Sequence, residues 1–390
     1  MADNKDKKVL NVPALRFPEF TEEWKRIRVS DLLDFYSTNS LSWEQLEYES
    51  NEPYNLHYGL IHVGLPTLVD LTKDKLPSIK EENVPKKYEL CKEGDVAFAD
   101  ASEDTNEVAK VVEFYNLDGK KVVCGLHTIH GRDNNKQTAK GFLGYCFSST
   151  VFHNQIRRIA QGTKIYSINT RNFSEVFVGL PSKSEQHKIA TLLRLIDEHI
   201  STQNKIIEKL ETLIKGIIET VISSQKPNTF IKNCLECDSS TLQESQVAEN
   251  GAYPVYGATG INGYTETADV NGEAILITKD GSGVGTVKFA DGEYSYIGTL
   301  NRLIAREGYC LKYLYFALQG FYFEPYKTGM AIPHIYFKDY GKAKIFCPTI
   351  EEQSIIAKSL SVIENKISVE KQILFCNQLQ KSYLLSQMLI

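Results

Sequence analysis

The stretch PSKSEQHKIA at residues 181–190 returns as PTIEEQSIIA at residues 348–357, an offset of 167 residues (348 − 181). The proline, the Glu-Gln pair and the Ile-Ala pair occupy the same positions in both copies. Each copy also contains a capping-box pattern, Ser182-x-x-Glu185 in the first and Thr349-x-x-Glu352 in the second. Because such a hydroxyl and carboxylate satisfy backbone donors of a first helical turn, the sequence predicts that a helix starts at the same point of two repeated segments.

A long apolar stripe follows each predicted helix start. Its steps alternate between four and three residues, which is typical of a coiled-coil seam. Its members are Ile189, Leu193, Ile196, Ile200, Ile207, Leu210, Ile214, Ile217 and Val221 in the first copy, and Ile356, Leu360, Ile363, Ile367, Leu374, Leu384 and Met388 in the second. The polar residues that interrupt it are Gln203 in the first copy and Glu370, Asn377 and Lys381 in the second.

This pattern predicts two helices of about 40 residues, each roughly 60 Å long, which pack against each other as an antiparallel pair and act as a spacer. The alternative is two ordinary amphipathic helices on one globular core. Runs of this length exceed typical globular helices several-fold, which favours the spacer.

The segments before the two helices predict mixed α/β domains, because short β-rich runs alternate with Gly, Asn and Asp. The run GDVAFAD at 94–100 resembles GEAILIT at 272–278, and GTKIYSI at 162–168 corresponds to GMAIPHI at 329–335. Between the first glycines of these runs lie 68 steps in the first copy and 57 in the second. We therefore expect a pseudo-twofold internal repeat in which the domains differ and the helices do not.

Composition indicates a soluble globular protein with room for two domains, since 42% of the 390 residues are hydrophobic and 24% are charged. No apolar run approaches the roughly 18 residues of a membrane span. The charged start, Met1 to Lys8, lacks the apolar core of a signal peptide, so we expect a cytoplasmic protein.

The charge balance opposes unaided binding to nucleic acid through a basic face. The formal net charge is −5, with 19 Lys and Arg against 23 Asp and Glu in residues 21–180 and 11 against 13 in residues 226–348. Because phosphate contacts dominate affinity for DNA, a DNA reader of this composition either concentrates its cations locally or relies on a partner.

The cysteines and histidines predict no metal site. Eight cysteines are scattered over the chain, and the close pair Cys234-x-x-Cys237 lacks a second pair at zinc-finger spacing. The pair His127-x-x-His130 is equally weak evidence. We expect reduced and mostly buried thiols.

With these features the chain resembles the specificity subunits of type I restriction-modification systems. The resemblance rests on the doubled Pro-x-x-x-Glu-Gln-x-x-Ile-Ala helix start, the tandem repeat of domain and helix, and the loop YPVYG at 253–257. It implies a mixed α/β (α+β) fold with two target-recognition domains separated by long antiparallel coiled-coil helices. The predicted boundaries are an amino-terminal extension at 1–15, recognition domains at 16–181 and 226–348, and spacer helices at 182–225 and 349–390.

The resemblance also implies function and partners. Each recognition domain would read one half of a split, asymmetric target in double-stranded DNA through the major groove, and the helices would set the unread gap. Two methyltransferase subunits would dock on the helices, and motor-nuclease subunits would complete the restricting complex. S-adenosylmethionine, ATP and Mg²⁺ would belong to those partners, so we expect no cofactor in this chain. The methyltransferase subunits would also supply the missing cations.

Base edges are read by side chains with directional donors and acceptors, and the loops contain such residues. The candidates in the first domain are Asn39, His62, Asp100, Ser102, His127, Thr128, Lys164, Tyr166, Ser167 and Asn169. In the second domain they are Tyr256, Thr259, Lys279, Ser282, Thr299, Asn301, Lys327, Thr328 and His334. Ordinary tight turns between strands are the alternative for these loops. Because the two sets differ, we expect different half-sites.

Enzymatic readings find little support. Gly281-x-Gly283-x-Gly285 lacks the remaining residues of a nucleotide-binding loop, and no Pro-Pro pair of an amino-methyltransferase motif occurs. Glu23-Trp-Lys25 has a form found in many nucleases, but such tripeptides are common by chance. A two-headed protein-binding scaffold and an uncharacterised nuclease remain the alternatives to a non-catalytic DNA reader.

Overall fold

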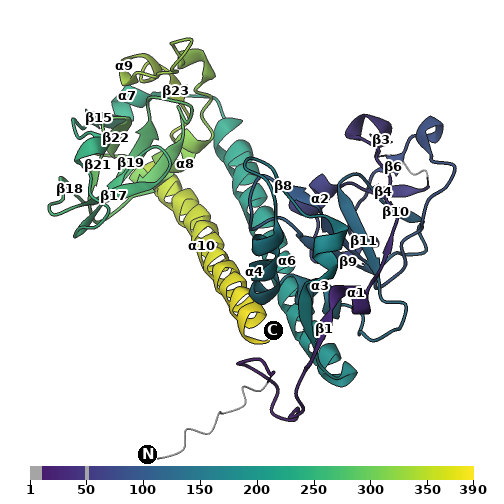
Figure 1. Ribbon diagram of the computed structural model, residues 1–390. Helices are drawn as coiled ribbons and strands as arrows, with labels where there is room; N and C mark the ends of the chain where they lie inside the picture. The colour runs from purple at the N-terminus through teal and green to yellow at the C-terminus, as the bar shows by residue number, and fades with distance from the viewer. Residues whose placement is uncertain (1–10, 49–51) are drawn as a thin grey trace, which may run out of the picture. The chain divides into compact units, whose positions relative to one another are not determined.

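The computed structural model describes residues 11–48 and 52–390, so the first ten residues of the predicted extension at 1–15 lie outside the described part. The chain divides into two compact units. The first contains the chain up to Thr202 together with Leu374–Ile390, and the second contains Gln203–Ile373. Each unit combines a sheet-rich domain with a segment of each of two long helices, which confirms the predicted mixed α/β fold (Figure 1).

The two long helices are α6, Lys183–Ile217, and α10, Ile350–Gln387 (Figure 1). At 1.5 Å per residue they are about 52 Å and about 57 Å long. A π-helical turn, Ile218–Ser223, continues α6. The first unit contains the start of α6 and the end of α10, and the second contains the reverse, which is the antiparallel arrangement expected of the pair.

The two helix starts use their capping residues differently. At α10 the predicted box forms in full, because Glu352 accepts from the Thr349 backbone N–H (3.1 Å) and donates its own N–H to the Thr349 hydroxyl (3.4 Å). At α6 only the second bond forms, from the Glu185 N–H to the Ser182 hydroxyl (3.4 Å). The carboxylate of Glu185 is instead bound by the Arg16 guanidinium at 2.6 and 2.7 Å.

The repeated glutamine explains much of the doubled motif. Gln186 donates to the carbonyl of Pro181 (2.9 Å) and accepts from the backbone N–H of Ala139 (2.7 Å). Gln353 does the same with Pro348 (2.9 Å) and with Cys310 (3.0 Å). Both glutamines are buried. Each one therefore fastens the start of a long helix to a loop of the domain that precedes it.

The predicted seam residues are shielded from solvent, with one correction. Every residue of this set is buried or half-buried: Ile189, Leu193, Ile196, Ile200, Ile207, Leu210, Ile214, Ile356, Leu360, Ile363, Ile367 and Leu374. The assignment of Val221 was wrong, since it is 38% exposed while Ile218 and Ile222 are buried. The π-helical turn inserts one extra residue per turn, which moves the buried face by one position.

The first domain is built on two main sheets. A five-stranded sheet has the order β2-β11-β7-β9-β5, and a four-stranded sheet has the order β10-β4-β6-β3. The strands are β1 Lys25–Arg28, β2 Asp34–Tyr36, β3 Leu46–Glu47, β4 Tyr54–Leu56, β5 Leu68–Asp70, β6 Ser78–Ile79, β7 Val96–Ala99, β8 Ala101–Ser102, β9 Val111–Asn116, β10 Val122–Cys124, β11 Thr128–Arg132, β12 Tyr166–Ser167 and β13 Phe177–Leu180. The short helices are α1 Val29–Leu32, α2 Tyr58–His62, α3 Phe142–Phe147, α4 Thr150–Ile159 and α5 Thr170–Ser174.

One hydrophobic core joins this domain to the helix pair. It contains Phe98 of β7 and Phe147 of α3 together with Leu193 of α6 and Leu384 of α10. The rings of Phe98 and Phe147 meet edge to face with centroids 4.9 Å apart. The domain therefore packs directly on the helices of its unit.

The second domain has two four-stranded sheets, β15-β22-β19-β20 and β17-β16-β21-β18. The strands are β14 Thr229–Phe230, β15 Leu235–Ser239, β16 Tyr253–Tyr256, β17 Ile261–Thr265, β18 Val270–Asn271, β19 Ala274–Thr278, β20 Val287–Ala290, β21 Glu293–Tyr296, β22 Leu300–Ala305 and β23 Lys344–Ile345, and the helices are α7 Ile231–Cys234, α8 Leu311–Gln319 and α9 Phe337–Tyr340. The Tyr315 hydroxyl of α8 donates to Glu364 of α10 (2.7 Å), which ties this domain to its own long helix.

Candidate nucleic-acid interface

Both domains contain the same short loop, at residues 161–167 in the first domain and at residues 328–334 in the second. Gln161 and Ser167 exchange two backbone hydrogen bonds (2.9 and 2.8 Å), and so do Thr328 and His334 at the offset of 167 residues (2.9 and 2.7 Å). A glycine follows the first residue of each pair, with φ of +131° at Gly162. A Cβ there would lie 1.9 Å from the carbonyl oxygen of Ile165, so only glycine fits this turn.

Equivalent backbone bonds attach the loop to the rest of each domain. The N–H of Ile168 donates to the carbonyl of Asp100, and the N–H of Ile335 donates to that of Lys279, both at 2.9 Å. The N–H of Asp100 then donates to the carbonyl of His127 (3.0 Å), as that of Lys279 does to Thr299 (2.9 Å). Asp100 and Lys279 therefore occupy equivalent positions, and His127 and Thr299 do so as well.

In the first domain this scaffold presents a paired histidine. His127 is half exposed, and its Nδ1 lies 3.1 Å from the carboxylate of Asp100. Burial raises the pKa of Asp100 above its usual range, and the opposing effect of His127 is smaller. The ring of Tyr58 meets the His127 ring edge to face, with centroids 5.3 Å apart. A histidine with one nitrogen fixed in this way offers the other as a directional hydrogen-bonding group.

Several other first-domain candidates lie on the same structure. Ser102 pairs with Tyr166 in the β8–β12 ladder, and Ser167 beside it is exposed. Lys164 is exposed at the loop tip. Asn169 is exposed, but its side chain caps α5 by accepting from the N–H of Asn172 (2.8 Å). The structure thus brings Asp100, Ser102, His127, Lys164, Tyr166 and Ser167 together along one loop-and-strand scaffold.

Three first-domain candidates serve the fold. The Thr128 hydroxyl is buried and donates to the carbonyl of Gly125 (2.6 Å). The Asn39 amide donates to Asn55 (2.7 Å) and to the carbonyl of Cys124 (3.0 Å). His62 is half-buried, with Nε2 3.0 Å from the carbonyl oxygen of Ala101. We remove Thr128 from the candidates, since its one hydroxyl is already used and covered.

The second domain also presents a histidine fixed by an aspartate, at a different place. His334 Nδ1 lies 2.6 Å from Asp280, next to Lys279 in sequence. Lys279 is half-buried, and its ammonium donates to the Ser239 hydroxyl (3.4 Å). Ser282, three residues after Lys279, and Thr328, six residues before His334, are exposed. Thr299 is half-buried.

The remaining second-domain candidates are more dispersed. Asn301 is buried and accepts from the Ser239 hydroxyl (2.9 Å), so we remove it. Lys327 forms an ion pair with Glu324 on the same turn. Tyr256 packs its ring against Tyr294 with centroids 5.4 Å apart, and Thr259 is exposed in the turn that follows.

Some exposed apolar residues also lie on these loops, although only polar side chains were predicted to contact DNA. The tips of the repeated loops expose Ile165 (62%), Ile332 (58%) and the whole of Met330. Apolar side chains of this kind can contact thymine methyl groups or wedge between base steps. The repeat itself, with isoleucine at the same position of both loops, was the signal that could have identified them.

One cluster of metal-ligand side chains lies inside the first domain. The ligand atoms of Cys91, Cys124 and His130 lie within 4.8 Å of one another, and all three residues are buried. Spacing along the chain gives no sign of this cluster, because Cys91 and Cys124 are 33 residues apart. Separately, the described residues contain no helix long and apolar enough to span a membrane.

Comparisons with known proteins agree on one family. A family model described as "Type I restriction modification DNA specificity domain" matches residues 21–212 and 235–375. The putative type I restriction enzyme MjaX specificity subunit of Methanocaldococcus jannaschii is 26% identical over 207 residues, which are 53% of this chain and 47% of that protein. The match therefore spans about half the length of that relative.

Two solved structures have a similar fold. The crystal structure of the type I restriction-modification system S subunit from M. genitalium gives a TM-score of 0.64, with 16% identity, over 97% of this chain and 99% of that chain. A chain from a structural study of complex assembly and conformational transition of the type I R-M system gives a TM-score of 0.54, with 15% identity, over 93% and 96%. At these identities the likeness concerns the fold alone.

Proposed function

The chain belongs to the type I restriction-modification DNA specificity family, and from this premise we propose that each of its two domains reads one half of a bipartite, asymmetric target in double-stranded DNA. In this proposal the domains are the target-recognition domains at 16–181 and 226–348. In this proposal the chain itself performs no reaction and needs no S-adenosylmethionine, ATP or Mg²⁺ for recognition.

The proposal rests on one observation, which is that equivalent backbone positions of the two domains carry side chains of opposite charge. Where the first domain has Asp100 beside His127, the second has Lys279 beside Thr299, on equivalent backbone bonds. A carboxylate accepts from the amino group of cytosine, whereas an ammonium donates to the oxygen and nitrogen of guanine. Two such surfaces favour different bases, so the two halves of the target should differ.

The apolar residues left exposed on α10 support docking of methyltransferase subunits on the helices. Ile355, Val362 and Val369 follow at seven-residue spacing and are 64%, 69% and 47% exposed. None of them belongs to the seam with α6. A second heptad stripe suits a partner helix, because it repeats on the same face every two turns. We propose that two methyltransferase subunits dock on the helices and supply cations that the acidic chain lacks.

The larger assembly follows from the same proposal. Motor-nuclease subunits would join the methyltransferase complex to cut DNA. S-adenosylmethionine, ATP and Mg²⁺ would act in those partners. The helices α6 and α10 would set the distance between the two half-sites as the spacer at 182–225 and 349–390.

Selection of random duplexes tests this function. The chain, assembled with its methyltransferase, is expected to enrich two short unlike sequences with a constant gap. Lys279→Ala should relax one position of one half if the ammonium contacts a base, or weaken binding to all duplexes if it contacts phosphate. Lys342→Ala, an exposed lysine of the same unit, is the control. Equal binding of all duplexes by the wild-type assembly would refute the proposal.

A further inference from the structure

Three buried ligand side chains converge from separate segments of the first domain. Cys91 precedes β7, Cys124 ends β10 and His130 lies in β11. The sulfur atoms of the two cysteines are 3.5 Å apart, and all three ligand atoms lie within 4.8 Å of one another. Among residues 11–48 and 52–390, these are the only His, Cys, Asp and Glu side chains that gather closely enough in a group of three to hold a metal ion.

The histidine of this cluster has an unused nitrogen. His130 is completely buried, and its Nδ1 has no hydrogen-bond partner in the described structure. Leaving such a buried atom unsatisfied costs stability. Its other nitrogen, Nε2, lies 2.7 Å from the carboxylate of Asp95. One side of the ring is therefore fixed while the other is left for a ligand.

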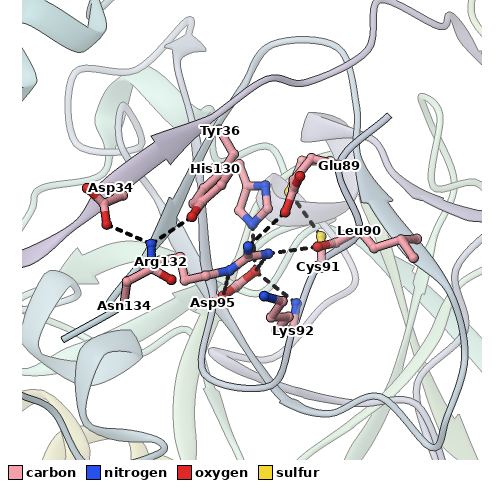
Figure 2. A network of polar contacts seen from close by, with 11 residues as sticks. Asp34, Tyr36, Glu89, Leu90, Cys91, Lys92, Asp95, His130, Arg132 and Asn134 are labelled. Carbon is pink, nitrogen blue, oxygen red and sulfur yellow. Dashed lines mark hydrogen bonds and ion pairs between the residues drawn. The ribbon is translucent and has the colours of Figure 1, made fainter. Parts of the chain in front are cut away.

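The carboxylate behind the histidine is itself held in place. Arg132 donates to both oxygens of Asp95 (2.9 and 2.8 Å), and the Lys92 backbone N–H donates to one of them (2.8 Å). Figure 2 shows these contacts of Asp95 with Arg132 and His130, and Cys91 in the same network. Metal-bound histidines usually donate their second N–H to such a carboxylate, which orients the ring.

The spacing and charge of the cluster match one class of ion. Tetrahedral zinc with Zn–S bonds of about 2.3 Å and Zn–N bonds of about 2.0 Å separates its ligand atoms by roughly 3.5 to 3.8 Å. Two thiolates and a neutral imidazole balance the charge of a divalent ion, and Asp95 is balanced by Arg132. Thiolate ligands also disfavour Mg²⁺ and Ca²⁺, which prefer oxygen.

We propose that Cys91, Cys124 and His130, through its Nδ1, bind one Zn²⁺ ion in the first domain. The fourth ligand would be a water molecule; Cys124 is part of the lining of a cavity of about 480 Å³ that also contacts Asp100 and His127. A disulfide between the two cysteines is the competing arrangement. It would need the sulfur atoms about 2.05 Å apart and would leave His130 Nδ1 without a partner.

The ion would join the two main sheets of the domain close to the reading surface. Cys124 lies in the β10 sheet and His130 in the β11 sheet. The turn between them carries His127, so the ion would fix the position of that histidine. In the second domain the position of His130 is occupied by Arg302, three residues after Thr299. Arg302 forms an ion pair with Asp238 (2.9 Å) and cannot bind a metal ion. The site is therefore expected in one domain only.

Metal content of the full-length chain tests this inference directly. The protein, produced in zinc-supplemented medium and dialysed, is expected to retain one zinc per chain by mass spectrometry of the metal. After removal of zinc, Co²⁺ should bind with one-to-one stoichiometry. It should show the thiolate-to-metal charge-transfer and d–d absorption of a tetrahedral sulfur-ligated site. These measurements use the unaltered chain, so they do not depend on whether a variant folds.

Three substitutions identify the ligands. Cys91→Ser and Cys124→Ser should lose the zinc, and so should His130→Gln, which can retain the bond to Asp95 while removing the Nδ1 ligand. Cys146→Ser is the control, because Cys146 is an equally buried cysteine of the same unit outside the cluster. It should retain one zinc per chain.

Three results would overturn the inference. The first is wild-type protein that holds no zinc and gives no charge-transfer band with Co²⁺. The second is a Cys91–Cys124 disulfide in natively purified protein, detected by peptide mapping without reductant. The third is zinc retained by folded Cys91→Ser and Cys124→Ser variants.

Discussion

At the scale of single residues, the tightest constraint on the loop at 161–167, a part of the proposed DNA interface, is a glycine. Gly162 has φ of +131°, and a Cβ would lie 1.9 Å from the carbonyl oxygen of Ile165. We expect Gly162→Ala to lower the free energy of unfolding by about 1–3 kcal/mol and to weaken recognition of one half-site. Urea unfolding measures the first effect and duplex selection the second.

Gly216 provides the matched control for this substitution. It lies inside α6, and a Cβ there meets nothing within 4 Å. Gly216→Ala should stabilise the protein by up to about 1 kcal/mol, because alanine is the better helix former. Equal stability of the two variants would contradict the account of the loop.

A buried carboxyl makes stability depend on pH. Burial raises the pKa of Glu113 from 4.5 to about 7, although the N–H groups of Gly141 and Gly144 donate to it. Between these values the folded protein holds a proton that the unfolded chain releases, so the contribution of Glu113 to stability rises as pH falls.

Glu113→Gln tests this dependence, because the amide stays neutral at every pH. From about pH 7.5 to about pH 5.5, the stability of the wild type relative to the variant should rise by about 2 kcal/mol. Urea unfolding at the two pH values measures the difference. Parallel changes in both proteins would show that Glu113 titrates normally.

Individual side chains were the hardest part to predict from the sequence. His127 and Asp100 were identified by residue type, and the structure brings them together. Thr128 and Asn301 have equally suitable chemistry but are buried, and their side chains form hydrogen bonds within the fold. Burial of one loop residue depends on packing between distant strands, which residue type and local spacing do not reveal. The Cys91, Cys124 and His130 cluster could not be predicted either, because it also depends on packing between distant strands.

At the scale of elements, polar residues interrupt the helix seam at one shared point. Gln203 donates to Glu370 (2.5 Å), and the two positions are equivalent in the repeat of 167 residues. Glu370 is buried and also pairs with Lys366. Such a buried polar pair costs stability compared with apolar packing but can specify the register of a helix pair.

A double-mutant cycle tests this role. Gln203→Leu should lower the midpoint of thermal unfolding by several degrees, because a buried carboxylate loses a donor. The double variant Gln203→Leu and Glu370→Leu should recover that loss. Gln378→Leu, an exposed glutamine of α10, should change little. Additive effects of the two single substitutions would show that the pair does not interact.

Shortening the helix pair tests its proposed role as a spacer between the half-sites. Deleting residues 204–210 and 363–369 removes one heptad from each helix and keeps Gln203 and Glu370. The spacer then shortens by roughly 10 Å, so the gap in the methylated target should shrink by about three base pairs. An assembled variant that methylates targets with an unchanged gap would refute the ruler.

At the scale of the whole molecule, the repeat was the most informative property of the sequence. The doubled helix start predicted α6 and α10 within a residue of their observed starts. The offset of 167 residues also matched the loops at Gly162 and Gly329, which have the same backbone bonds. The order of strands within each sheet could not be predicted, because it depends on contacts distant in sequence. The division of each long helix between the two compact units could not be predicted either.

In the proposed function, one chain carries two unlike DNA-reading domains. Mapping methylated adenines across a host genome, with the chain and its methyltransferase expressed together, tests it most directly. We predict a single split motif with two different halves, a constant gap, and complete loss when the chain is omitted. A continuous motif, two identical halves, or methylation that persists without the chain would contradict the account.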